Sequence, residues 1–99
     1  LEDGNQQHFE PDVRISLFAE DRLGVVEDAT VPLANAGLNI LHLESNLGEN
    51  DKAGTYYIHL EGTLSKGLEP IYEVLEKLEE EKEIRSHLIP VNRSGITKI

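Results

Sequence analysis

The first regular pattern in the chain is an alternation of apolar and polar positions over residues 13–19. A period of two residues is typical of a strand that buries one face. The preceding residues 1–12 are polar and show no apolar period, so we expect a flexible acidic N-terminal tail there. The apolar positions of the expected strand are Val13, Ile15, Leu17 and Ala19.

After Gly24 the spacing changes and predicts an amphipathic helix that stops at Gly37. Pro32 lies inside this pattern, where a proline removes one backbone hydrogen bond and costs ~3 kcal/mol. Because Pro32 falls beside the apolar stripe, we expect a kink on the solvent side of the helix and not a break. The stripe recurs at steps of three and four residues and consists of Val26, Ala29, Leu33 and Ala36.

Residues 38–45 and 56–60 predict two further strands, joined by a turn segment over residues 46–54 that is dense in Gly, Asn and Asp. We expect these two strands to form a hairpin. A turn near residues 50–51 would place His42 and His59 opposite each other across the ladder, with their side chains ~5 Å apart.

The pattern over residues 68–78 predicts a second amphipathic helix. Pro70 suits its first turn, where the missing amide hydrogen has no helical partner. The acidic run over residues 76–83 is interrupted by Lys77 and Lys82, which is typical of a solvated helical face and not of a cation site. The apolar positions of this helix are Leu68, Ile71, Val74, Leu75 and Leu78.

Residues 84–91 predict a short closing strand, in which Pro90 indicates an edge position or the end of the strand. Residues 92–99 are expected to form a C-terminal tail or linker. The element order over residues 13–91 is therefore β, α, β, β, α, β. With right-handed crossovers this order gives an α+β fold, the ferredoxin-like βαββαβ sandwich, with an antiparallel four-stranded sheet and two helices on one face.

The formal net charge is −10, from 19 acidic and 9 basic residues, which argues against nucleic acid or an anionic membrane as a partner. The 99 residues suffice for one core. No apolar run approaches the ~20 residues of a membrane span, and no secretory signal is expected. The absence of cysteine excludes disulfides and thiol nucleophiles and points to a reducing compartment, the cytoplasm. Without a methionine, the chain is expected to be an excised domain.

Catalytic motifs are missing: the chain has no G-x-S-x-G elbow, P-loop or G-x-G-x-x-G loop, and its histidines offer at most two neighbouring metal ligands. We expect no catalytic residue, metal or cofactor. The informative segment is residues 21–26, between the first strand and the first helix. Gly24 lets the backbone approach a ligand, and the helix N-terminus offers free amides that suit a carboxylate. On these residues alone, an ordinary strand-to-helix turn is the simpler interpretation.

The stretch DRLGVVEDATVPLANAGLNILHLES, residues 21–45, resembles the first half of an ACT domain. Within that family, Gly24-Val25-Val26 is similar to a Gly-Ala-Leu turn that two groups of regulatory domains share. One group belongs to aromatic amino-acid hydroxylases, such as phenylalanine hydroxylase, and the other to prephenate dehydratases. Residues 39–45 are similar to the strand of these domains that ends in Glu-Ser, and residues 54–62 to their third strand. The resemblance covers residues 13–91.

This resemblance implies an allosteric regulatory domain that is not itself an enzyme. It would bind an amino acid, L-phenylalanine, at a homodimer interface and control an attached catalytic domain of aromatic amino-acid metabolism. Carried over by position, the ligand-binding residues are Leu23, Gly24, Val25, Val26, Asn39, Ile40, His42, Leu43, Glu44 and Ser45.

The chain departs from those relatives at Asn46-Leu47, where they have Arg-Pro. Loss of the arginine leaves serine or a branched amino acid open as the ligand. A dimerisation module without a ligand is the main alternative function. An acylphosphatase that uses Arg22 in a phosphate loop and an RNA-binding module that uses Tyr56 and Tyr57 share the expected topology, but the acidic charge argues against both.

Overall fold

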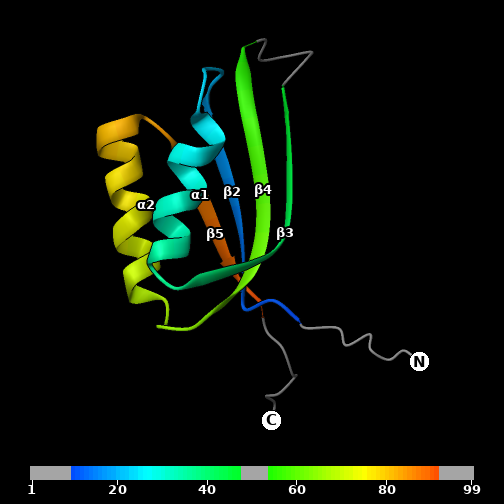
Figure 1. The fold of residues 1–99 in the computed structure, drawn as a ribbon, viewed down its shortest axis with the longest axis vertical. Helices are drawn as coiled ribbons and strands as arrows, with labels where there is room; N and C mark the ends of the chain where they lie inside the picture. Colours follow the sequence, from blue (N-terminus) through cyan, green and yellow to red (C-terminus); the bar gives the residue numbers. More distant parts are fainter. Residues whose placement is uncertain (1–9, 48–53, 92–99) are drawn as a thin grey trace, which may run out of the picture.

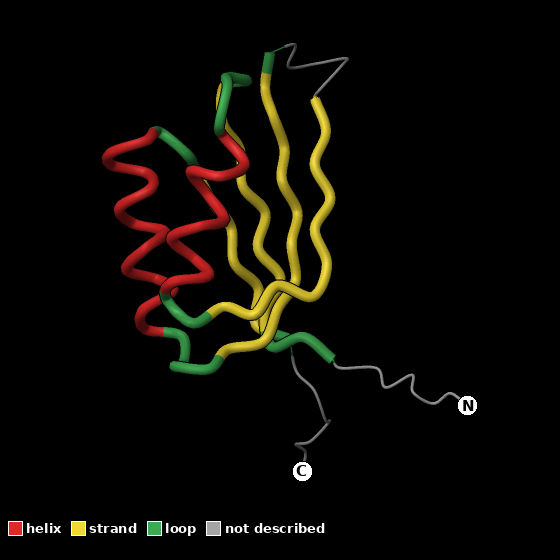
Figure 2. Tube along the Cα trace, viewed as in Figure 1, coloured by secondary structure: helices red, strands yellow, loops and turns green. Residues whose placement is uncertain are grey.

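The computed structural model describes residues 10–47 and 54–91. Within them, four strands and two helices follow one another in the predicted order. Figure 1 shows both helices on one face of the sheet, and Figure 2 shows the same two layers coloured by secondary structure. The elements are β2 (Val13–Glu20), α1 (Val25–Asn35), β3 (Leu38–Leu47), β4 (Thr55–Leu64), α2 (Glu69–Lys82) and β5 (Arg85–Pro90).

The sheet has the strand order β3-β4-β2-β5, and each neighbouring pair is antiparallel. Strands β2 and β4 form its centre, while β3 and β5 form its edges. This arrangement confirms the ferredoxin-like βαββαβ sandwich predicted from the element order. It also places Pro90 on an edge strand, as expected for a residue that cannot donate a ladder hydrogen bond.

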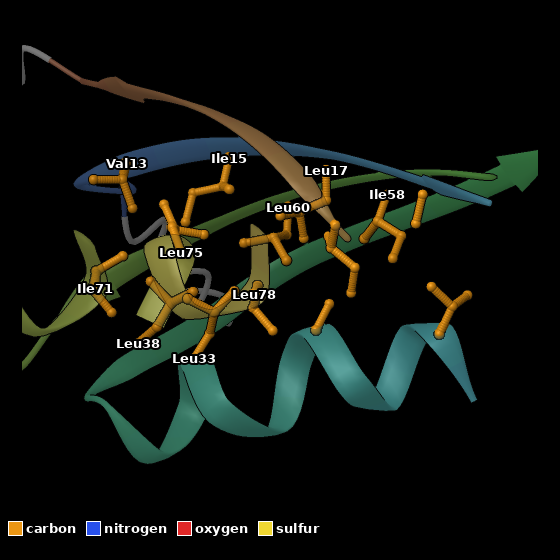
Figure 3. Close-up of a cluster of buried hydrophobic side chains, with 14 residues drawn as sticks. Val13, Ile15, Leu17, Leu33, Leu38, Ile58, Leu60, Ile71, Leu75 and Leu78 are labelled. Carbon is orange, nitrogen blue, oxygen red and sulfur yellow. The ribbon is translucent and has the colours of Figure 1, made fainter. Parts of the chain in front are cut away.

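The core lies between the sheet and the two helices (Figure 3). The alternation along β2 and β4 turns every second side chain toward the helices, and Ile15 and Leu60 are each only 1% exposed. Burial of one such large apolar side chain contributes about 1.5–3 kcal/mol. The buried core residues are Val13, Ile15, Leu17, Ala19, Val25, Ala29, Leu33, Leu38, Ile58, Leu60, Ile71, Leu75, Leu78 and Ile84.

Helix α1 turns a slightly different row of residues to the core than the spacing predicts. Its buried residues are Val25, Ala29 and Leu33, whereas Val26 is half-buried. The buried row therefore repeats every four residues and begins one position earlier. Val26 therefore lies beside the core, in the first turn of α1.

Pro32 lies within α1, and the helix continues unbroken through it. The side chain is half-buried and lines a groove together with Val74 and Leu78 of α2. The prediction that Pro32 does not break the helix is therefore confirmed, whereas its expected solvent-side position is wrong, because α2 packs along that side of α1. The helical pattern of α1 alone does not show where a second helix packs.

Strands β3 and β4 are longer than the apolar pattern suggests. β3 continues through Asn46 and Leu47, which were expected in a turn, and β4 ends only at Leu64. Pairing with the neighbouring strand satisfies the backbone groups of these polar ends, whatever side chains they carry. The expected turn at residues 50–51 and most of both expected tails lie outside the described residues.

A β-bulge just before His42 shifts the register of the β3–β4 pair. From His42 to Leu47 the register is uninterrupted and pairs His59 with Glu44 and His42 with Glu61, so the predicted opposition of the two histidines is wrong. The bulge inserts Leu41 as an extra residue, and an alternation pattern does not reveal such an insertion.

Gly62 marks a close approach of the β3 and β4 backbones. A Cβ atom at this position would lie 2.5 Å from the carbonyl oxygen of Asn39. We expect Gly62→Ala to lower the free energy of unfolding by about 1–3 kcal/mol, the range for overpacking a filled site. Urea denaturation measures the change. Asn39→Ala, at an exposed neighbouring position, is the control and should cost less than about 0.5 kcal/mol. Equal losses for both variants would contradict the steric explanation.

Candidate functional site

The turn between β2 and α1 brings backbone amides to the surface. Gly24 precedes the helix in the left-handed conformation, with φ of 81°, which favours glycine. No side chain caps the N-terminus of α1, so its first-turn amides are not occupied by a capping group. The turn is closed by its own backbone, since the amide of Asp28 donates to the carbonyl of Gly24 at 2.9 Å. These features suit the binding of a carboxylate.

Arg22 fixes this turn to the rest of the fold. Its Nη1 donates to Oδ2 of Asp28 at 2.6 Å, and its Nη2 donates to the carbonyl of Lys82 at the end of α2, at 3.2 Å. The hydrogen bond from Arg22 lowers the pKa of Asp28 below its ordinary value. Arg22 therefore has a structural role in this arrangement, and its guanidinium does not stand free in a phosphate loop.

An open hollow of about 670 Å³ lies beside the turn. Residues 21–27 form most of its wall, and Tyr56 of β4 closes another side. The hydroxyl of Tyr56 donates to Oγ of Ser45 on β3, at 3.0 Å. Tyr56 therefore links the strand-to-helix turn with the second strand of the predicted site. The carboxylates of Asp21 and Glu27 also line the hollow.

Strand β3 has a row of side chains on the helix side of the sheet that the helices leave open. Leu43 and Ser45 pair with the buried residues Leu60 and Ile58 of β4, and side chains of directly paired residues point to the same side. Leu43 is nevertheless 36% exposed and Leu47 45% exposed. The edge strand thus carries an uncovered apolar surface on the helix side of the sheet, next to Tyr56.

The structure brings together part of the predicted ligand-binding set. Gly24, Val25 and Val26 line the hollow, and Leu43 and Ser45 share its side of the sheet. Val25 also belongs to the core, with 3% exposure.

Leu23 is the fourth predicted residue at the hollow, whereas Ile40, His42, Glu44 and Asn39 do not line it within one chain. Leu23 lines the hollow but is 99% exposed, and Ile40 packs half-buried against the core. His42 and Glu44 share a contact of 3.2 Å on the sheet face that carries no helix. Asn39 lies on that face as well, and its amide donates to Oγ1 of Thr63 at 3.4 Å.

Tyr56 is the residue that sequence reasoning missed. It was assigned to the alternating pattern of the third strand, which predicts only that it faces the helices. Its position in the hollow depends on the register that pairs it with Leu47 and lets it reach Ser45. No local sequence signal carries that information.

Among residues 10–47 and 54–91, no three His, Cys, Asp or Glu side chains gather as a group that could hold a metal ion. No helix in these ranges is long and apolar enough to cross a membrane.

No known family profile and no curated protein sequence matches the chain. Solved structures do match its fold. An ACT domain protein from Streptococcus pneumoniae superimposes with a TM-score of 0.66 at 13% identity, over 83% of this chain and 91% of that one. The chain has the fold of an ACT domain. The ACT fold thus confirms the structural part of the resemblance seen in residues 21–45.

Longer proteins also contain this ACT fold. Prephenate dehydratase from Staphylococcus aureus matches with a TM-score of 0.65 at 20% identity, over 89% of this chain and 34% of that protein. A formyltetrahydrofolate deformylase from Pseudomonas syringae matches with a TM-score of 0.68 at 18% identity, over 86% of this chain and 29% of that protein. The chain therefore spans about a third or less of these two proteins.

The bond between Arg22 and Asp28 predicts a pH-dependent contribution to the stability of this ACT fold. Because folding lowers the pKa of Asp28, the stabilisation is fully present above the ordinary carboxyl pKa of about 4 and is lost as the pH falls through the lowered folded value. We expect Asp28→Asn to be less stable than the original chain at about pH 7, and the difference to shrink toward about pH 3.

Urea titrations at both pH values measure this difference. The same substitution made in an Arg22→Gln background is the control, because the guanidinium that lowers the pKa is then absent. A difference that persists unchanged at low pH would show that the carboxylate of Asp28 does not act through Arg22.

Proposed function

We propose that this chain is a regulatory domain that binds an amino acid, with L-phenylalanine as the expected effector, between two copies of itself. The observation that carries the proposal is the hollow at the N-terminus of α1, where Gly24 and an uncapped first helical turn lie next to Tyr56. The domain itself performs no chemistry in this proposal. It changes the state of an attached catalytic domain through its own binding equilibrium.

The hollow offers a partner for each part of an amino acid. Amides of the first turn of α1 suit the carboxylate. The carboxylates of Asp21 and Glu27 suit the ammonium group. Val26 and the ring of Tyr56 supply apolar surface, and an aromatic ring gains additional energy from an edge-to-face contact with a second ring. This last point favours phenylalanine over serine, the smaller alternative.

A second copy would complete the site at the open edge of the sheet. Strand β3 is an edge strand, and Leu41, Leu43 and Leu47 are each at least 36% exposed along it. Pairing with another β3 would continue the sheet and cover these side chains. The same observation supports the second candidate function, a dimerisation module without a ligand.

The attached domain is proposed from the partial coverage of longer proteins. Prephenate dehydratase contains this fold in about a third of its length. A parent enzyme of aromatic amino-acid metabolism fits both that match and the resemblance of residues 21–45.

Isothermal titration calorimetry with phenylalanine, serine, valine and leucine tests the proposal, together with sedimentation equilibrium with and without each amino acid. Heat of binding with phenylalanine and a ligand-dependent rise in mass are expected. A dimer that binds none of the four amino acids would identify the dimerisation module instead. No heat and no mass change would contradict both functions.

Leu23 allows a first test of the site without disturbing the core. We expect Leu23→Glu to weaken phenylalanine binding about tenfold, because a new carboxylate next to the first helical turn repels the ligand carboxylate. Val31→Glu is the matched control, since Val31 is 53% exposed on α1 outside the lining of the hollow. Calorimetry should find its affinity unchanged, and equal losses in both variants would exclude a specific effect at the turn.

Glu44 and Ser45 are neighbours in sequence whose side chains point to opposite faces of β3. Substitutions at these two positions therefore test the two sides of the predicted site separately. We expect Ser45→Val to weaken phenylalanine binding about tenfold, because it removes the hydrogen bond that holds Tyr56, which lines the hollow. Glu44→Ala should retain the affinity within about twofold, since Glu44 contacts His42 on the other face. The reverse outcome, measured by the same calorimetry, would assign recognition to the Glu44 side.

A further inference from the structure

The sheet face that carries no helix is a second surface, separate from the hollow beside α1. Its side chains are those that alternate with the core residues of the four strands. We refer to this surface as the open sheet face. Asn39 and Thr63 lie at one end of it, and Glu20 and Thr55 at the other. Its central members are His42, Glu44 and Asn46 of β3, Tyr57, His59 and Glu61 of β4, Arg14, Ser16 and Phe18 of β2, and Arg85, His87 and Ile89 of β5.

The strand register aligns these side chains in three rows that run across the sheet. The first row passes through residues 42, 61, 14 and 89, the second through residues 44, 59, 16 and 87, and the third through residues 46, 57, 18 and 85. Within each row the order of strands is β3, β4, β2, β5.

Charge divides the three rows of this face into two halves. Both carboxylates, Glu44 and Glu61, lie on β3 and β4. Both guanidinium groups, Arg14 and Arg85, lie on β2 and β5, and His87 lies with them. Beyond the three rows, the exposed Glu20 at the end of β2 adds a carboxylate to this half, so the positive charge is confined to the rows themselves.

The centre of the third row is aromatic. The rings of Phe18 and Tyr57 meet edge to face, with centroids 5.6 Å apart and planes at 87°. Both side chains are half-buried. At the β5 edge, Ile89 is 49% exposed. The face thus combines a divided charge pattern with apolar surface in the middle and at one edge.

We propose that the open sheet face packs against the same face of a second copy of this chain, about a two-fold axis that runs parallel to the strands between β2 and β4. Such an axis places β5 of one protomer over β3 of its partner and β2 over β4, row upon row. Arg14 then meets Glu61 of its partner, and Glu44 meets His87. The rings of Phe18 and Tyr57 face Tyr57 and Phe18 of the partner.

Each contact occurs twice across the axis, as an isologous interface requires. Sheets that pack face to face keep their strands within about 30° of each other, which a two-fold axis along the strands satisfies. Strand spacing of ~4.8 Å and three rows give a footprint of roughly 19 by 20 Å. The area of this footprint, roughly 400 Å², is below the ~800 Å² per partner of a standard interface, so the association is weak and needs high protein concentration.

This contact differs from the edge pairing of the proposed dimer. Arg14 and Glu61 lie on the two central strands, where pairing of β3 with a second β3 does not reach. Within one chain Nε of Arg14 contacts Oε2 of Glu61 at 3.0 Å. A test must therefore separate the pair within a chain from the pair between chains.

Reciprocal charge reversal distinguishes the Arg14–Glu61 pair within a chain from the same pair between chains. Arg14→Glu alone gives a protomer with two carboxylates at the contact, and Glu61→Arg alone gives a protomer with two guanidinium groups. We expect the dissociation constant for the face-to-face step to rise at least about tenfold for either variant alone, because like charges then meet across the axis. A 1:1 mixture of the two variants should associate within about threefold of the original chain, since opposite charges meet again.

Sedimentation equilibrium at low salt measures all four samples, and a fluorescent label on one variant identifies the mixed species. Lys66→Glu and Glu80→Arg, which carry the same charge changes at exposed positions outside the open sheet face, are the matched controls and should behave like the original chain. Recovery in the mixture supports the proposal, because the pair within each chain stays broken there.

Three results would overturn the proposal: an original chain that stays monomeric or forms only the edge dimer, single variants that associate like their controls, or a mixture that fails to recover. A labelled single-stranded RNA is added to the same series. RNA binding without self-association would assign the aromatic pair to nucleic acid instead. Amino-acid calorimetry is independent of all these outcomes, so failure of the proposed effector site and failure of this interface are distinguishable.

Discussion

The structure depends on strand β2, which has a neighbouring strand on each side and a buried inner face. This strand is hydrogen-bonded to β4 on one side and to β5 on the other, and its inward side chains Val13 and Leu17 have no exposed surface. Both helices pack against the side of the sheet to which these side chains point. Where β2 ends at Glu20, the chain leaves the sheet and enters α1 after only four residues. The position of the strand-to-helix turn is therefore set by the end of the best-buried strand.

The hollow beside that turn follows from the unequal width of the two layers. Two helices cover the inner strands of a four-stranded sheet, and the edge strand β3 remains largely exposed beyond α1. The turn and Tyr56 consequently border a space that one chain does not fill. A second copy at the β3 edge would supply the missing wall, which is how the proposed ligand site and the proposed dimer depend on each other.

The two faces of the sheet have different chemistry because strand alternation separates them. Residues next to each other in sequence, such as Glu44 and Ser45, lie on different faces of the sheet. Ser45 lies on the helix side of the sheet, where it accepts a hydrogen bond from Tyr56. Glu44 lies on the open sheet face, where the proposed second copy would pack. A two-layer fold with helices on one side can in this way support two separate association surfaces.

The sequence by itself determined the element order, most of the core and the fold, because apolar periodicity reports which side of each element is buried. It also located the turn at Gly24, where a local backbone conformation demands glycine. Only the tertiary structure decided the register of β3, the contact of Pro32 with α2 and the position of Tyr56. A bulge, a helix-helix contact and a cross-strand hydrogen bond each join segments distant in sequence, so no local pattern encodes them.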